Sequence, residues 1–457
     1  MALQLAILVP GKAESSSAAT TAYSAGIDYY FPWYDTASGR TWVLTAMPGS
    51  GPGNLFDIYL GTQSLTSGGF DVSAGVTRPN YFSGLMGGPV KVQAADGPGL
   101  VSERSLFGNS FEEIWATPYE ELDSHYFWPI YDGVAEDGMR NWVLVANPPE
   151  NDGPVRIEVR IHFPPQFGGP EFYYTTLDPG EMTVPQFPGL RSGPVEVKAW
   201  RVNGSPFNPA DARKVIASQR VLFRDSFNEM PGIPKRKLWP YWAWTWLDNK
   251  SPGAAAWLAV GNPNIQSISL LIISGQSQPV LIDEVPPGET TVVSPVQPIM
   301  EGPVLMMACF DSSGINFESK IDSCLESPAD IYASQRSIWG PSFSEIAGVT
   351  DDDFGTSVHW TWYDQQSPGA SNWVLMTNLN EEDIFAEVRI GGGSPRWSGW
   401  IGPFQSATPT FPGVMGGPVE VRAWTSSSRA PGTEAEVFAS QRVLWNGYFN
   451  EIVGKGM

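Results

Sequence analysis

The side chains in this chain best suited to chemistry are charged groups that recur at fixed spacings. Four times an arginine is followed nine residues later by a glutamate, and an aspartate that ends an aromatic segment precedes each pair. The pairs are Arg104 with Glu113, Arg220 with Glu229, Arg336 with Glu345 and Arg442 with Glu451, and the aspartates are Asp35, Asp132, Asp248 and Asp364. Carboxylates can serve as general acids and bases, but one active site repeated four times would be unusual. We therefore expect structural ion pairs, no catalytic residue and no enzyme, with each arginine bound to its glutamate or its aspartate.

The alternation of side chains along a strand predicts which way these arginines face. Arg220 and Leu222 project from one face of the predicted strand, and Gln219 and Val221 project from the other. The position of Leu222 is Leu or Ile in all four occurrences, whereas the position of Val221 is Ser in two of them. We therefore expect the face with the arginine to be the inner face of its sandwich, where a guanidinium needs a carboxylate partner.

No other polar residues have the spacing of a catalytic or metal-binding motif. The three histidines, His125, His162 and His359, occupy different positions of the repeat described below and do not form a known metal-ligand pattern. The acidic run Asp351–Asp353 is interpreted either as a solvated linker or as a calcium site between domains. We expect no cofactor and no metal at any other place.

Two cysteines, Cys309 and Cys324, enclose a 14-residue insert. They are interpreted either as a disulfide that closes the insert or as two inert buried thiols. A zinc site is disfavoured because no histidine or second cysteine pair lies nearby. A disulfide would indicate an oxidising, extracellular setting.

These charged residues belong to a repeat that occurs four times. Each copy contains an aromatic segment ending in Asp, a Trp-led apolar run, a Gly-Pro-Val segment and a final motif, always in that order. The final motif reads VSERSLFGNSFEE, ASQRVLFRDSFNE, ASQRSIWGPSFSE and ASQRVLWNGYFNE, beginning at Val101, Ala217, Ala333 and Ala439. Repeats of this length each form one folding unit rather than one rung of a solenoid.

The pattern inside each copy predicts strands and no long helix. VEVRAW and VEVKAW alternate apolar and polar residues, and Asn-Pro and Pro-Gly pairs bound the runs. The expected fold is all-β: four tandem antiparallel β-sandwich (Ig-like) domains in a row, after an extended N-terminal arm. The predicted ranges are 1–21 for the arm and 22–117, 118–233, 234–349 and 350–457 for the four sandwiches.

Aromatic residues provide the candidates for ligand binding. Alternate aromatics such as Trp244 and Trp246 are interpreted mainly as sandwich core, although an exposed row of this kind can stack on sugars. Trp397 and Trp400 lie in a Gly-rich hairpin of the fourth copy and are the better candidates for an exposed glycan-binding patch.

The N-terminal arm has the pattern of a short strand on a tether. Leu3, Leu5, Ile7 and Val9 are its assembly residues, and a Ser- and Ala-rich stretch follows Gly11. A lone apolar strand is not stable in water and must pair with a sheet edge. It is expected to pair within its own chain or to add to an edge of a neighbouring copy, which would give a head-to-tail homopolymer.

Composition excludes several partners. The net charge of −21 leaves no basic stripe for nucleic acid or anionic lipid. No apolar run of 18 residues is present, so we expect no membrane-spanning helix.

The repeat resembles tandem β-domains of bacterial secreted and cell-wall-associated surface proteins. The residues that carry the resemblance are W-Y-D, N-W-V-L, G-G-P-V-E-V, A-S-Q-R-V-L and F-N-E, and it covers about 435 of 457 residues. The resemblance implies an extracellular β-protein and supplies no catalytic residue.

Two functions follow as hypotheses. The first is a non-catalytic extracellular structural protein, a subunit of a surface layer, sheath or filament whose main partner is itself. The alternative is a cell-surface adhesin or carbohydrate-binding protein whose partner is a cell-wall or extracellular glycan.

Overall fold

The computed structural model describes residues 26–456 except 50–51, 135–137, 164–168, 276–278, 295–297 and 311–316. It is 55% strand and 5% helix, so the expected all-β fold is confirmed. Within these residues the helices are α1 (Phe317–Glu326) and the 3-10 helices η1 (Tyr119–Glu121), η4 (Pro209–Asp211), η5 (Lys235–Lys237) and η6 (Asp351–Asp353). Within the described ranges, no helix has the length and hydropathy needed to cross a membrane.

Each repeat contributes a four-stranded antiparallel sheet that begins at the centre of the molecule, here called its axial sheet. From the centre outward, the axial sheet of repeat 1 is β11 (Ser110–Trp115), β10 (Leu100–Phe107), β3 (Arg40–Ala46) and β7 (Thr77–Asn80). That of repeat 2 is β22 (Ser226–Pro231), β21 (Ile216–Phe223), β15 (Met139–Ala146) and β18 (Met182–Thr183). Repeat 3 has β33 (Ser342–Ala347), β32 (Tyr332–Trp339), β26 (Ala254–Gly261) and β29 (Thr290–Val293), and repeat 4 has β43 (Tyr448–Val453), β42 (Phe438–Trp445), β36 (Ala370–Thr377) and β39 (Ser406–Ala407).

A second antiparallel sheet, the flanking sheet, packs on one face of each axial sheet. In repeat 1 it is β12 (Thr117–Pro118), β1 (Ile27–Phe31), β9 (Val90–Ala94), β4 (Asn54–Leu60) and β5 (Gln63–Ser64), with β6 (Phe70–Val72) also on β4. In repeat 2 it is β23 (Ile233–Pro234), β13 (His125–Trp128), β20 (Val195–Arg201), β16 (Val155–Ile161) and β17 (Glu171–Leu177). Repeat 3 has β24 (Tyr241–Trp244), β31 (Val304–Cys309), β27 (Ile268–Ser274) and β28 (Val280–Val285), and repeat 4 has β44 (Lys455–Gly456), β34 (Ser357–Trp360), β41 (Val419–Trp424), β37 (Ile384–Ile390) and β38 (Trp397–Ile401).

A two-residue ladder also links the aromatic segment of each repeat to the stretch before its Gly-Pro-Val strand. These ladders are β2 (Tyr34–Asp35) with β8 (Met86–Gly87), β14 (Tyr131–Asp132) with β19 (Arg191–Ser192), β25 (Leu247–Asp248) with β30 (Met300–Glu301) and β35 (Tyr363–Asp364) with β40 (Met415–Gly416).

Each sandwich has its own core because the strands alternate apolar and polar side chains. The same anchor position supplies a fully buried aromatic residue in every repeat: Phe31, Trp128, Trp244 and Trp360 are all at most 1% exposed. Separate clusters of buried residues surround these four side chains. The aromatic segment is therefore core at its first position and does not form an exposed row there.

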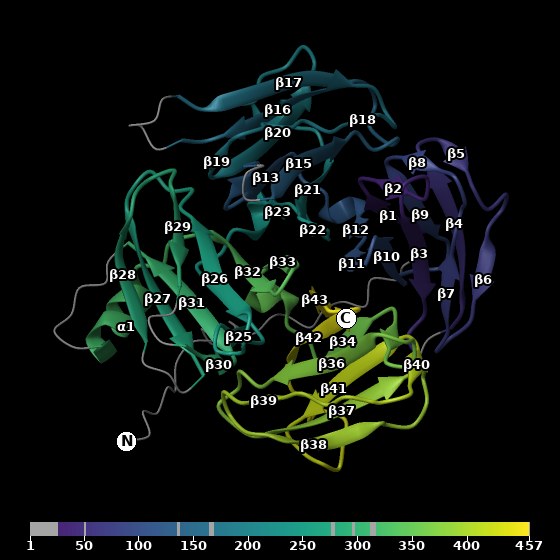
Figure 1. The fold of residues 1–457 in the computed structure, drawn as a ribbon, viewed down its shortest axis with the longest axis vertical. Helices are drawn as coiled ribbons and strands as arrows, with labels where there is room; N and C mark the ends of the chain where they lie inside the picture. The colour runs from purple at the N-terminus through teal and green to yellow at the C-terminus, as the bar shows by residue number, and fades with distance from the viewer. Residues whose placement is uncertain are drawn as a thin grey trace.

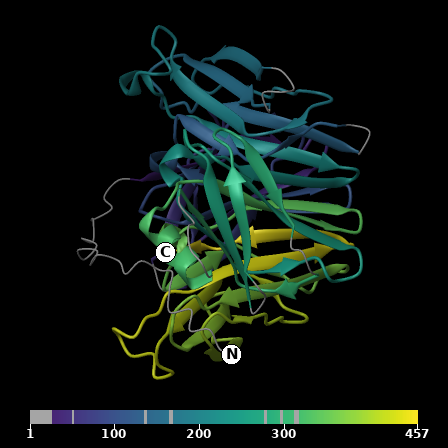
Figure 2. The same cartoon turned by 90° about the vertical axis from the view of Figure 1, so that its left-hand side faces the viewer.

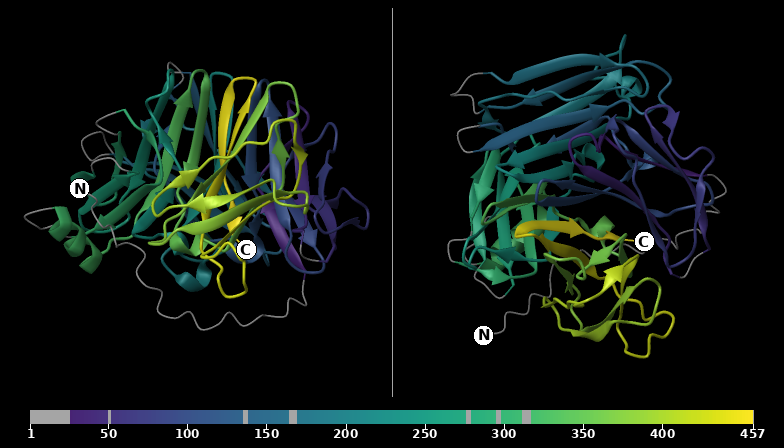
Figure 3. Two further views of the ribbon diagram at one scale, coloured as in Figure 1. Left: turned by 90° about the horizontal axis from the view of Figure 1, so that it is seen from below. Right: turned by 45° about the vertical axis from the view of Figure 1, so that its right-hand side comes forward.

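The four sandwiches do not form the predicted row but close into a ring around one axis (Figure 1). A serine hydroxyl at the start of each of three innermost strands accepts a hydrogen bond from a phenylalanine amide of the next: Ser110 from Phe227, Ser226 from Phe343 and Ser342 from Phe449, at 2.8–2.9 Å. The fourth gap is closed by Asn450, which donates to Glu112 at 2.6 Å. Views from the side show the repeats at one level along this axis (Figures 2 and 3).

The ring explains why the predicted inner face of the Arg-bearing strand is wrong. Val443 is buried in the core of its own sandwich, and Val221 is buried against Phe223 of its own repeat and Phe343 of the next, whereas the arginine face turns toward the preceding repeat. Phe111 of repeat 1, on the same face as Glu113, lies in the hydrophobic core of repeat 4, and Leu106 packs there as well. An apolar face that a row would leave in water is thus buried between sandwiches.

Candidate functional site

The recurring arginines and glutamates lie directly opposite each other on the hairpins of the axial sheets. Arg104 pairs with Glu113 at 2.5 Å, Arg336 with Glu345 at 2.8 Å and Arg442 with Glu451 at 2.5 Å, and Arg220 also pairs with Glu229. The serine two residues before each arginine donates to the same glutamate at 2.6–2.7 Å: Ser102, Ser218, Ser334 and Ser440. Each carboxylate is therefore held by a guanidinium and a hydroxyl, and its proton-accepting capacity is already used.

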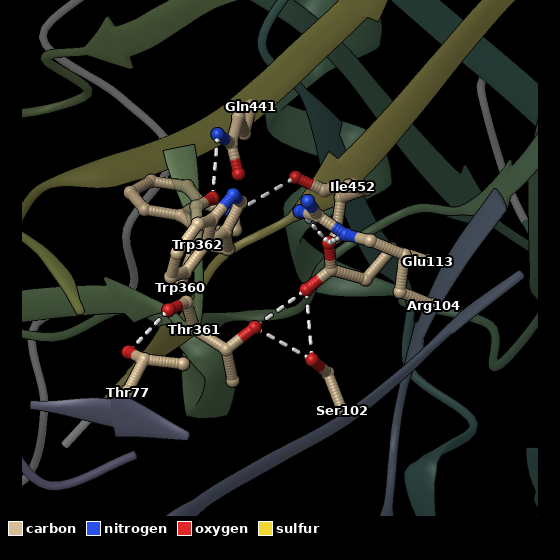
Figure 4. Close-up of polar contacts among 9 residues, drawn as sticks. All are labelled: Thr77, Ser102, Arg104, Glu113, Trp360, Thr361, Trp362, Gln441 and Ile452. Atoms are coloured by element: carbon tan, nitrogen blue, oxygen red, sulfur yellow. Dashed lines mark hydrogen bonds and ion pairs between the residues drawn. The ribbon is translucent and has the colours of Figure 1, made fainter. Parts of the chain in front are cut away.

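These ion pairs fasten one repeat to the next, as Figure 4 shows for Arg104 and Glu113 at the junction of repeats 4 and 1. At the junction of repeats 4 and 1, Thr361 donates to Glu113 at 2.6 Å and lies 2.6 Å from the hydroxyl of Ser102. Thr77 in turn donates to the backbone carbonyl of Thr361 at 2.6 Å. At the junction of repeats 3 and 4, Thr245 donates to Glu451 at 2.9 Å. The sequence pattern did not indicate this role because the threonines belong to a different repeat from the pair they contact.

The four aspartates grouped with these ion pairs do not bind the anchor arginines. Asp35, Asp248 and Asp364 each accept two backbone amides two and three residues ahead, at 2.9–3.0 Å. Asp132 instead pairs with Arg191 at 3.1 Å. The aspartates follow the aromatic segment at a turn, where a short carboxylate readily caps the backbone. Their recurrence therefore reflects turn chemistry, which the sequence analysis did not consider.

The axis itself holds a polar cluster that the sequence analysis missed. The residue before each pairing glutamate points to the axis: Glu112, Asn228, Ser344 and Asn450, all buried. Glu112 accepts hydrogen bonds from Asn228 at 3.1 Å and from Asn450 at 2.6 Å. Burial raises the pKa of Glu112 well above its usual value, although the two amides oppose this shift. The position varies between repeats, so recurrence gave no signal for it.

A cavity of about 610 Å³ opens along the axis beyond this cluster. All four repeats contribute its walls, which are largely apolar and include Trp115, Ile233 and Trp242, with Glu112 at the lining. Two ion pairs stand among its lining residues, Lys237 with Asp353 at 2.8 Å and Lys455 with Glu121 at 3.2 Å. A concave apolar site with a shifted titratable group is the usual location of a binding site, but the other carboxylates that line this cavity are already paired with arginines or lysines.

The raised pKa of Glu112 leads to a pH-dependent prediction. An acid whose folded pKa is raised contributes its stability below the unfolded pKa and loses it as the pH rises through the folded pKa. Glu112→Gln keeps the acceptor oxygen and cannot ionise, so it should match the wild type at pH 4 and exceed it at pH 8 by about 1–3 kcal/mol. Thermal unfolding between pH 4 and 9 measures this. Parallel curves for the two proteins would show that Glu112 is not buried in its neutral form.

Two of the three histidines meet at one carboxylate, which their spacing in the sequence did not suggest. His125 lies 2.7 Å and His162 3.3 Å from Glu196. Burial alone would raise the pKa of Glu196, but the hydrogen bonds from both imidazoles lower it below its usual range. His359 lies elsewhere, and burial, with the charge of Arg422, lowers its pKa to about 4. Within the described residues no group of three or more His, Cys, Asp or Glu side chains forms a metal site.

The two tryptophans proposed as a ligand patch lie on opposite faces of β38. Trp400 is 53% exposed and packs edge-on against Phe385, whereas Trp397 packs against the core of repeat 4. The three-residue separation places them on different faces because side chains of a strand alternate with period two. Only Trp400 is available to a ligand.

Cys309 and Cys324 form the expected disulfide, with their Cα atoms 5.0 Å apart. It joins β31 to α1 and is buried with Leu271, Met307 and Ile321. The bond fixes the helical insert against the flanking sheet of repeat 3.

Two candidates from the sequence remain, the acidic run and the N-terminal arm. The acidic run 351–353 forms η6, and its Asp353 is engaged by Lys237 and by the amide of Thr350 at 3.2 Å. The arm residues Leu3, Leu5, Ile7 and Val9 lie outside the described residues.

Neither a protein-family model nor a curated protein matches this chain.

Proposed function

We propose that the chain is a non-catalytic extracellular structural protein, a ring-shaped subunit of a surface layer, sheath or filament. The recurring charged residues serve the junctions of the ring and leave no carboxylate pair for catalysis. The Cys309–Cys324 disulfide is of a kind that persists in oxidising compartments. Both features support a rigid building block outside the cell.

The free edge of β17 is the observation that carries this proposal. β17 is seven residues long, Glu171–Leu177, and within the described part of the chain it pairs only with β16. It contains no Lys or Pro, which often protect a sheet edge, and its only charged residue is Glu171 at its first position. Its outer face carries Phe172 and Tyr174, which are 40% and 51% exposed. A long, unprotected and partly apolar edge favours pairing with another strand.

The N-terminal segment of another copy is the partner we propose for this edge. Residues 3–9 have the alternation of a strand and precede a small-residue tether. Adding this strand to β17 of the next ring joins two different surfaces, and a heterologous contact of this kind builds an open polymer. β17 is preferred over β28 and β38 because it is the longest of the three outer edge strands.

Sedimentation and electron microscopy of three variants test this assembly. The wild type should polymerise with increasing concentration, whereas deletion of residues 1–12 and Tyr174→Lys should each leave single rings. Phe207→Lys, at an 89% exposed loop position, is the matched control and should assemble normally. Assemblies that survive both the deletion and Tyr174→Lys would contradict strand addition at β17.

Glycan binding is the second candidate, and one specific observation favours it. Phe172 and Tyr174 stack with their ring centroids 5.9 Å apart and their planes within 10°, which gives a flat aromatic surface. Trp400 provides a similar exposed ring on the corresponding strand of repeat 4. Rings that stay single at every concentration but adsorb to cell-wall polysaccharide, and lose adsorption in Trp400→Ala, would favour this function over assembly.

A further inference from the structure

The junction of repeats 3 and 4 contains a second pocket, of about 290 Å³, which adjoins the axial cavity and shares Trp242, Val349 and Phe354 with it. Aromatic and aliphatic side chains form most of its wall: Trp239, Tyr241, Leu271, Leu305, Phe354 and Phe404. Flanking-sheet strands β24, β27 and β31 supply one side of it, and loops of repeat 4 supply the other. The pocket is therefore a small apolar site between two sandwiches.

The charged groups of this pocket are all acidic. Asp351, Glu381 and Glu436 belong to its lining, and the described lining contains no Lys, Arg or His. Burial, and to a lesser extent the charge of Asp351, raise the pKa of Tyr241, in keeping with the acidic lining. Aromatic faces beside carboxylates attract organic cations.

The equivalent place between repeats 1 and 2 shows what fits there. Lys91 lies opposite Tyr30 in the β1–β9 ladder, and its ammonium pairs with Glu150 of repeat 2 at 2.7 Å. The hydroxyl of Tyr30 donates to the same glutamate. An alkylammonium and an aromatic ring from repeat 1 thus occupy this junction.

The junction of repeats 3 and 4 has the equivalent glutamate but lacks the lysine and the tyrosine ring. In the β24–β31 ladder the residues in register with Tyr30 and Lys91 are Ala243 and Leu305. Glu381 corresponds to Glu150, because each glutamate follows by three residues an asparagine with the same role. These asparagines, Asn147 and Asn378, donate to the carbonyls of Leu177 and Ile401, both at 2.9 Å.

The other two junctions differ from this arrangement. The position of Lys91 is Glu196 in repeat 2 and Glu420 in repeat 4, which places a carboxylate where an ammonium would stand. The combination of a retained acid, a missing lysine and a missing ring is thus found at the pocket between repeats 3 and 4.

We propose that this pocket binds a small alkyl- or arylalkylammonium ion. Its cationic nitrogen would take the place of the Lys91 ammonium, against Glu381. Its hydrocarbon part would fill the space that Ala243 and Leu305 leave, between the rings of Tyr241 and Phe404. The wall disfavours an anion because the charged side chains of its described lining are all acidic.

Isothermal titration calorimetry with phenethylammonium tests the site, with 2-phenylethanol as the neutral analogue of equal size. The wild type should bind the cation at least about tenfold more tightly than the alcohol. Glu381→Gln changes an exposed side chain, so the fold should be unaffected, and it should remove the preference for the cation while keeping affinity for the alcohol. Equal affinities of the wild type for the two probes would overturn the proposal.

Two further experiments define which ligand the pocket binds. Leu305→Lys installs the lysine of the first junction, and it should abolish phenethylammonium binding while circular dichroism stays unchanged. Persistent binding in this variant would place the ligand elsewhere and contradict the proposal. Nα-acetyl-lysine amide distinguishes a free amine from a protein side chain: weaker binding than phenethylammonium is expected, and binding of this probe alone would overturn the assignment to a small amine.

Discussion

Arg336→Met is expected to destabilise the ring by about 3–5 kcal/mol, because it leaves a buried carboxylate without its cation. Arg336 and Glu345 form the most buried of the four ion pairs, with side chains 3% and 1% exposed. Arg336 also donates across the junction to the carbonyl of Ile130 at 3.3 Å and lies over the ring of Phe343. Methionine retains much of the packing of the aliphatic part of arginine. The loss of stability therefore measures mainly the effect of removing the positive charge.

Denaturant unfolding measures this effect, and two controls separate its causes. Lys214→Ala breaks an ion pair with Glu120, which is 88% exposed, and should cost less than about 1 kcal/mol. The double variant Arg336→Met with Glu345→Leu removes both charges and should recover most of the loss. An Arg336→Met protein no less stable than Lys214→Ala would show that the pair is not buried between repeats.

Deletion of residues 448–457 is the second change with a large expected effect. The deletion removes β43, and with it Glu451 from its ion pair and Asn450 from the axis. It also removes the carbonyl of Val453, which accepts from Trp115 of repeat 1 at 2.7 Å. Loss of the buried Phe449 and Ile452 alone costs about 5–10 kcal/mol, comparable to the whole stability of a typical domain.

The truncated protein should therefore lose the fold of repeat 4 and expose the face of repeat 1 that packs on it. Near-ultraviolet circular dichroism and limited proteolysis measure this, with cleavage expected first within residues 350–447. Deletion of residues 1–10 removes the same length from the other end, outside the described residues, and should leave the fold intact. A truncated protein as resistant as the full chain would contradict a closing role for β43.

The strands could be predicted from sequence because their pattern is local. Alternation with period two and the flanking turn residues belong to a single segment, and they locate VEVKAW and VEVRAW as β20 and β41. The nine-residue spacing of Arg220 and Glu229 also has a local origin, since a tight hairpin places the two residues opposite each other. The same argument located the disulfide across one short insert.

The ring could not be predicted because its contacts join residues far apart in the chain. Alternation shows that both faces of the Arg-bearing strand are partly apolar, but it does not show that a neighbouring sandwich covers one of them. Thr361 and Glu113 are separated by 248 residues, and no spacing rule connects them. Glu112 lies at the axis because the four repeats close into a ring. Its burial and its hydrogen bonds to two asparagines therefore could not be predicted from the sequence.

The closed ring also limits how assembly can occur. The inner edges of the axial sheets are covered by their neighbours at the axis, so that side of the sheets is closed to new strands. The flanking sheets of repeats 2, 3 and 4 end at the rim in β17, β28 and β38. Each of these edges belongs to a different repeat. Because their sequences differ, an added strand can bind one of them in preference to the others.

Small-angle X-ray scattering of the dilute, single-ring fraction tests the central claim, that the four repeats close on themselves, most directly. A compact chain of 457 residues should have a radius of gyration of about 23 Å. Four sandwiches in a row would give roughly 40 Å and the distance distribution of a rod. A radius below about 30 Å with a symmetric distance distribution is the result expected of the ring. A rod-like profile would contradict the ring and the junction roles of Arg104, Thr361 and Glu112.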